Sequence, residues 1–152
     1  MKSAADAIAV LNRLLRTLFR SLPMYLADAQ PFTPREQIAL RDAIQRLAAD
    51  RQAYADRLGQ AVLDLGGIPD FGAFPGWYTG IHDVAVDYLA SRIDEQMADE
   101  VAVVEQCIAA LPEGSAERDL AREILGNTRS HREALTGLRQ KPDCAEAAPA
   151  NS

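Results

Sequence analysis

The stretch GGIPDFGAFPGWYT, residues 66–79, decides the fold, because it separates two long amphipathic segments and is too long for a hairpin turn. It has about 14 residues and is rich in glycine, proline and aromatic side chains. Fully extended, it could span about 46 Å at roughly 3.3 Å per residue. A helix of roughly 30 residues is about 45 Å long. The stretch is therefore long enough to cross a helical bundle end to end, which predicts that the helices before and after it run parallel.

Apolar residues recur at steps of three or four positions in four segments, which is the period of one helix face. The predicted helices cover residues 3–28, 33–65, 80–111 and 116–139. The first and third connections are short and predict antiparallel neighbours, so the fold class is all-α, a four-helix bundle with a long crossover between helices two and three. The bundle domain is expected over 1–139. Residues 140–152, with proline, alanine and asparagine but no periodicity, predict a disordered tail.

Cap signals support these boundaries. Ser3 with Asp6 fits a capping box, and Pro23 predicts a kink or an early end of the first helix. The run Thr33-Pro34-Arg35-Glu36 predicts the start of the second helix, with threonine as the N-cap, proline in the first turn and glutamate closing a box. Ser115 is expected to cap the fourth helix.

Composition excludes several classes of protein. The chain of 152 residues is 48% hydrophobic and 25% charged, with a net charge of -6, which is too acidic for the basic face that a nucleic-acid protein needs. The same charge argues against an anionic membrane surface, and no apolar run approaches the roughly 18–20 residues of a membrane span. We therefore expect cytoplasmic residence. Cys107 and Cys144 make neither a disulfide framework nor a zinc motif.

At this point the pattern resembles the ferritin-like superfamily, especially the bacterioferritin-like and rubrerythrin-like bundles. The matching pieces are LNRLLR at 11–16, the segment from Leu58 to LGGIP at 65–69, and EILGN at 123–127 followed by His131. The resemblance covers most of residues 3–139. It implies a bundle that could hold a di-iron or di-manganese centre.

Such a centre takes one glutamate from each of two helices and a Glu-x-x-His pair from each of the other two. Two hard cations need these carboxylates to balance their charge. On this chain the resemblance places the family positions on Leu18, on Arg51 with Tyr54, and on Thr128 with His131. Leucine and arginine cannot bind a metal ion. The di-iron site is therefore expected to be degenerate.

The register of the third helix leaves the remaining position between Glu95 and Glu100, with Met97 on the apolar stripe. At most His131 and one carboxylate then remain of about six family ligands. We expect no metal and no cofactor. If a metal ion binds, its ligands would be His131, Glu100 and Glu95.

The helical stripes place Arg51, Tyr54, Thr128 and His131 on core-facing positions, which suggests a polar layer inside the bundle. A buried guanidinium needs a carboxylate, because an isolated buried charge is expensive. The candidate partners are Glu100, Glu95, Asp94 and Asp50. The simpler alternatives are that the arginine reaches water along its stem, that the tyrosine only packs, with its hydroxyl satisfied, and that the histidine is a hydrogen-bonded core or boundary residue.

The loop carries four aromatic residues, Phe71, Phe74, Trp77 and Tyr78. They either pin the crossover onto the bundle or form a partner surface or a lid over a small pocket.

The preferred interpretation is a non-catalytic ferritin-like module that has lost the di-iron centre and acts through assembly or partner binding. A homodimer could form through the outward apolar residues Leu14, Phe19 and Val103. The alternative is a metal-binding oxidoreductase with iron or manganese at an atypical site near His131. A third option is a small-molecule pocket beneath the aromatic loop.

Overall fold

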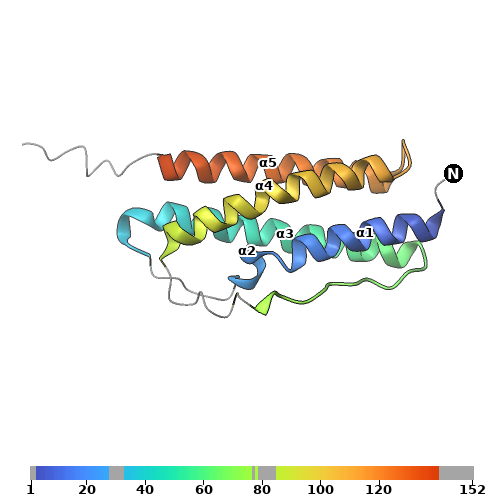
Figure 1. Ribbon diagram of the computed structural model, residues 1–152, viewed down its shortest axis with the longest axis horizontal. Coiled ribbons are helices and arrows are strands. Elements are labelled where there is room, and N and C mark those ends of the chain that lie inside the picture. The colour runs from blue at the N-terminus through green and yellow to red at the C-terminus, as the bar shows by residue number, and fades with distance from the viewer. Residues whose placement is uncertain (1–2, 28–32, 77, 79–84, 141–152) are drawn as a thin grey trace, which may run out of the picture.

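The computed structural model describes residues 3–27, 33–76, 78 and 85–140 and is all-helical, as predicted. The elements in chain order are α1 (Ala4–Phe19), α2 (Leu22–Tyr25), the 3-10 helix η1 (Arg35–Gln37), α3 (Ile38–Asp64), α4 (Val86–Ala110) and α5 (Ala116–Gln140). Four of them are long and lie side by side in one elongated bundle (Figure 1). Of the predicted tail at 140–152, Gln140 is the last residue of α5, and residues 141–152 lie outside the described part of the chain. In the described part of the chain, no helix is both long and apolar enough to span a bilayer.

The directions of the helices follow from side-chain pairs between them. On α3, Arg57 pairs with Glu123 of α5. Asp50, nearer the start of α3, pairs with His131, nearer the end of α5, so these two helices are antiparallel. The α4–α5 turn likewise makes α4 antiparallel to α5. Consequently α3 and α4 run in the same direction, from left to right in Figure 1.

The segment that follows α3 returns along the outside of the bundle, against α1 (Figure 1). The Asn12 side chain donates to the carbonyl of Ile68 at 3.0 Å and accepts from the backbone N–H of Asp70 at 2.9 Å. The Arg16 guanidinium donates to the Asp70 carboxylate at 2.8 Å. These bonds fix the path of residues 66–72, which we call the strap, because they tie its backbone and the Asp70 side chain to two successive turns of α1.

The first helix begins and ends for the predicted reasons. The capping box is confirmed: the Asp6 N–H donates to Ser3 Oγ at 3.2 Å, and the Ser3 N–H donates to the Asp6 carboxylate at 3.1 Å. The predicted early end is confirmed too, since α1 stops at Phe19 and Pro23 lies in the first turn of the short α2.

The predicted start of the second helix was wrong. Pro34 has an extended ψ of 154°, and the chain then makes the single 3-10 turn η1 before α3 begins at Ile38. Neither Pro34 nor Gln37 makes a side-chain cap hydrogen bond. The predicted end is close to the observed one: Leu65 is the C-cap, and Gly66 follows with φ +86°, a conformation that glycine adopts without strain.

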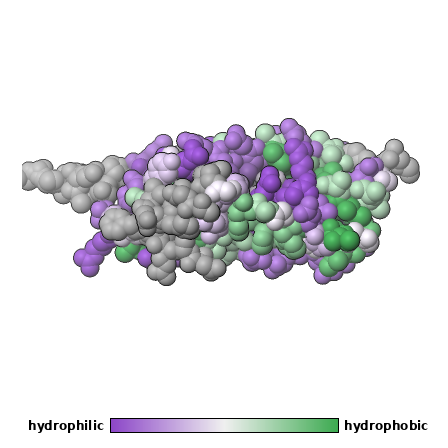
Figure 2. Space-filling view, turned by 60° about the horizontal axis from the view of Figure 1, so that its bottom comes forward, coloured by the Kyte–Doolittle hydropathy of each residue, from purple (hydrophilic) through white to green (hydrophobic). Residues whose placement is uncertain are grey.

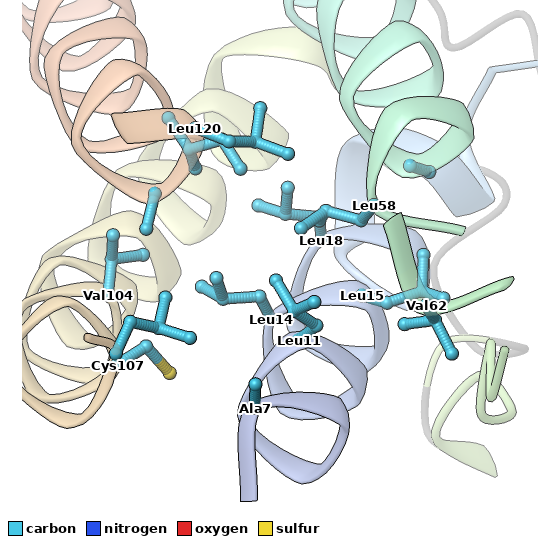
Figure 3. Close-up of a cluster of buried hydrophobic side chains, with 14 residues drawn as sticks. Ala7, Leu11, Leu14, Leu15, Leu18, Leu58, Val62, Val104, Cys107 and Leu120 are labelled. Carbon is cyan, nitrogen blue, oxygen red and sulfur yellow. The ribbon is translucent and has the colours of Figure 1, made fainter. Parts of the chain in front are cut away.

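The apolar core divides into two clusters along the bundle. The first joins α1, α3, α4 and α5 near the α4–α5 turn, and Figure 3 shows the leucines of α1 at its centre. The second joins α2, α3, α4 and the end of α5. Leu14, which we expected on an outer face, is fully buried in the first cluster, so that expectation was wrong. Phe19 and Val103 are only partly buried.

Candidate functional site

Polar residues occupy the level between the two apolar clusters on three helices. On α3 the second cluster ends at Leu47 and the first begins at Ala55, with Arg51 between them. On α4, Glu100 lies between Met97 and Val104. On α5, Thr128 lies between Ile124 of the first cluster and Leu135 of the second. This level, defined by Arg51, Glu100 and Thr128, is the candidate site, and we call it the polar layer.

Arg51 and Glu100 form a bidentate ion pair across the bundle. Arg51 Nη1 donates to Oε1 of Glu100 at 3.1 Å, and Nη2 donates to Oε2. The two residues are 1% and 5% exposed, so solvent hardly reaches the pair. A fork-shaped guanidinium matches both carboxylate oxygens, which makes this the strongest kind of side-chain pairing and fixes α3 relative to α4. Arg51 therefore has one of its four candidate partners and does not extend to solvent.

Thr128 and Met97 complete the interior at this level of the bundle. Thr128 is 2% exposed and Met97 is wholly buried. A thioether is a soft donor that hard cations disfavour, and a neutral threonine hydroxyl brings no negative charge to balance a cation. The side chains that surround the ion pair therefore favour packing over coordination.

His131 lies at the edge of the polar layer rather than within it. Its Nε2 is 2.7 Å from a carboxylate oxygen of Asp50, and Asn127 donates to that same oxygen at 2.9 Å. The hydrogen bond from Asn127 lowers the pKa of the Asp50 carboxyl, burial opposes it, and His131 lowers the pKa further. The Asp50 side chain is 46% exposed, so this pair is open to water, unlike that of Arg51.

Tyr54 also points to the edge, one turn further along α3. Its hydroxyl donates to Glu123 at 2.9 Å, and Arg57 donates to the same carboxylate at 2.7 Å. The Arg57 guanidinium lies 5.5 Å from the centre of the Tyr54 ring. Burial and the bond to Glu123 raise the pKa of Tyr54 to about 12, so the phenol stays protonated and acts as a donor.

The four residues named from the sequence thus divide into two pairs. Arg51 and Thr128 are buried, while Tyr54 and His131 bind carboxylates at the surface of the α3–α5 interface. Sequence reasoning missed the roles of Glu123, Asn127 and Arg57. The signal was present in their spacing, since Glu123, Asn127 and His131 repeat every four residues and present one polar face of α5 to α3.

The three residues named as candidate metal ligands do not converge. Glu100 is held by Arg51, His131 is paired with Asp50, and Glu95 lies on the surface of α4 beside Arg92. Within the residues that the structure describes, no three or more His, Cys, Asp or Glu side chains are grouped so that they could hold a metal ion. Cys107 is buried in the first apolar cluster, where burial raises the pKa of its thiol and keeps it protonated.

The aromatic residues of the connection pack against α1 and α2. The ring of Phe71 packs edge-on against the ring of Phe19, with the ring centroids 5.0 Å apart. The ring centroids of Phe74 and Tyr25 are 5.1 Å apart. Each of the two loop phenylalanines is still 39% exposed. Figure 2 faces this side of the molecule and shows hydrophobic patches interleaved with hydrophilic side chains.

Two other aromatic residues named as a partner or lid surface have different outcomes. Tyr78 is wholly buried, and its hydroxyl accepts a hydrogen bond from Gln96 at 2.7 Å, so it cannot belong to an exposed surface. Trp77 and the chain's other histidine, His82, lie outside the described residues. Of the described loop, only Phe71 and Phe74 remain candidates for partner contact.

Comparisons of the chain with protein-family models, with curated proteins and with solved structures return no significant match. The case for a function therefore rests on the residues described above.

Proposed function

We propose that this protein is a non-catalytic module of the ferritin-like kind, without a di-iron centre, that acts through assembly or partner binding. One observation carries the proposal: the buried Arg51–Glu100 pair lies at the level of the bundle where the resemblance places metal ligands. A guanidinium at that point supplies the positive charge that a bound cation would otherwise supply, and it repels a cation that approaches.

The arrangement of the helices supports the same proposal. Two antiparallel pairs, α1 with α3 and α4 with α5, are joined so that α3 and α4 run in the same direction, and the strap lies along the outside. The ferritin-like crossover, as the sequence resemblance describes it, has this order of directions. The exposed rings of Phe71 and Phe74 on the connecting segment offer a surface for a partner.

The experiment that tests the loss of the metal centre is elemental mass spectrometry on untagged protein from cells grown with added iron and manganese. We expect less than about a tenth of an equivalent of either metal and no uptake on titration, because a bound metal would need deprotonated ligands that are not already paired. Arg51→Glu is the informative companion variant, since it restores a carboxylate at the position that the resemblance assigns to one.

The second candidate is a metal-binding oxidoreductase, and the adjacent Asp50 and His131 side chains are the observation that favours it. One or two equivalents of iron or manganese in the unmodified protein, lost in both His131→Ala and Asp50→Asn, would establish this alternative and overturn the proposal. Asp119→Asn serves as the matched control, because Asp119 is an exposed carboxylate that pairs with Arg122 on the surface of α5.

A further inference from the structure

The last helix differs from the others in how it is held. α5 has 25 residues, and its buried residues are Leu120, Ala121, Ile124, Thr128 and Leu135. Between Ile124 and Leu135, only Thr128 is buried. On α1, by contrast, every turn contributes at least one buried apolar side chain to the core. The middle of α5 therefore gains little from apolar burial, which is the main favourable term in helix packing.

Polar side chains bridge this gap in α5. Glu123 and His131 pair with residues of α3 as described above, and on the α4 side Arg132 donates to Asp94 at 3.0 Å. Arg129 pairs with Glu105 at 3.3 Å. The carboxylates of these pairs are between 21% and 52% exposed. Water competes with every one of these ion pairs, so each pair contributes little to the free energy that holds α5 against α3 and α4.

Two glycines weaken α5 further. Gly126 and Gly137 lie inside the helix, and a Cβ added at either would meet no atom within 4 Å. Neither position requires glycine for packing, and neither φ lies in the left-handed region. Glycine inside a helix is less favourable than alanine because it loses more conformational freedom on folding. α5 thus has a low intrinsic helix stability, and exposed polar pairs hold its middle section.

We propose that α5 is a separable helix, which opens away from α3 and α4 as a unit while α1, α3 and α4 remain folded. The opening would uncover the faces of α3 and α4 on which Ile124 and Leu135 pack. This inference is independent of the proposed function, since it concerns how the bundle opens and not what binds at the polar layer.

Hydrogen exchange of the full chain, followed by mass spectrometry of its peptides, tests the proposal. We expect peptides of α5 to exchange at least about tenfold faster than peptides of α1 and α3 under native conditions. The double variant Gly126→Ala with Gly137→Ala should slow exchange in α5 by roughly tenfold, since each substitution removes a glycine penalty in a helix.

The matched variant is Val62→Ala, which removes contacts between α3 and α1. Figure 3 shows Val62 beside Leu15 and on the far side of the cluster from Leu120 of α5. It should accelerate exchange in α1 and α3 by roughly tenfold. Exchange in α5 should be unchanged, because the separate opening of α5 leaves the α1–α3 contacts intact. Equal acceleration of all helices, α5 included, would show that α5 opens only by global unfolding and would overturn the proposal.

Discussion

At the scale of single residues, the buried Arg51–Glu100 pair is the interaction whose disruption should lower the free energy of unfolding most. Arg51→Met leaves Glu100 buried without a counter-charge, which should cost about 3–5 kcal/mol of the free energy of unfolding. The double variant Arg51→Met with Glu100→Met should recover most of that loss, because an apolar pair needs no compensation. Urea unfolding followed by circular dichroism measures both.

The control for this prediction is Arg57→Met, which breaks the pair with Glu123 at a site where both side chains are 51% exposed. It should cost less than about 1 kcal/mol. A gain in stability from the single Arg51→Met change would contradict the description of the pair as a well-matched structural element.

The sequence correctly predicted that Arg51 and Thr128 are buried, but it did not select the partner of Arg51, and it misplaced Tyr54. Arg51 had four possible carboxylates because the register of α4 relative to α3 depends on long-range packing, which helix periodicity does not contain. Tyr54 was placed in the core by its stripe position. It turns outward because Glu123 and Arg57 lie within reach at the edge and satisfy its hydroxyl.

At the scale of elements, the strap depends on close backbone approach at one glycine. A Cβ on Gly67 would lie 2.7 Å from Cγ2 of Ile8, closer than atoms can pack, so Gly67→Ala must displace either the Ile8 side chain or the strap. We expect a loss of about 1–3 kcal/mol, and thus a melting temperature lower by several degrees, roughly 2–4 °C for each kcal/mol. Differential scanning calorimetry gives both quantities.

Gly76→Ala is the control for the strap, since a Cβ at that position would meet nothing within 4 Å. Its melting temperature should match that of the unmodified protein to within about a degree. Equal melting temperatures for the two variants would mean that the approach of Gly67 to Ile8 contributes nothing to holding the strap.

Helix boundaries were predictable where a side-chain cap or a glycine marks them, and the start of α3 was not predictable. Ser3 and Asp6 cap α1 as their spacing indicated. The run from Thr33 to Glu36 has the composition of a helix start, but Pro34 stays extended and a 3-10 turn intervenes before α3. Local residue preference cannot distinguish these two backbone paths, because both accept the same residue types.

At the scale of the whole molecule, the exposed rings of the connecting segment lead to a prediction about assembly. If copies associate through this face, Phe71→Ser with Phe74→Ser should convert the dimer into a monomer, because the double change removes the apolar centre of the contact. Light scattering after size-exclusion chromatography measures the mass. Tyr88→Ser, at a 49% exposed aromatic residue on α4, is the control and should leave the dimer intact.

A monomer at every concentration in the unmodified protein would refute assembly through copies of this chain. The partner surface would then have to serve a different protein.

Helix directions and the long connection were inferred from segment lengths alone, whereas the exposure of Phe71 and the burial of Tyr78 depend on how the loop folds over α2, which no periodic pattern specifies.

The Arg51–Glu100 pair also limits which substitutions the sequence can accept at these two positions. A mutation at either position alone strands a charge in the interior, so the two positions can change only together or through a damaged intermediate. A glutamate at position 51 would set two carboxylates face to face in a dry interior, where they cannot both ionise without a cation. Such a chain could fold with one proton shared between the two carboxylates, and a metal ion that replaced this proton would stabilise the folded state by binding to it.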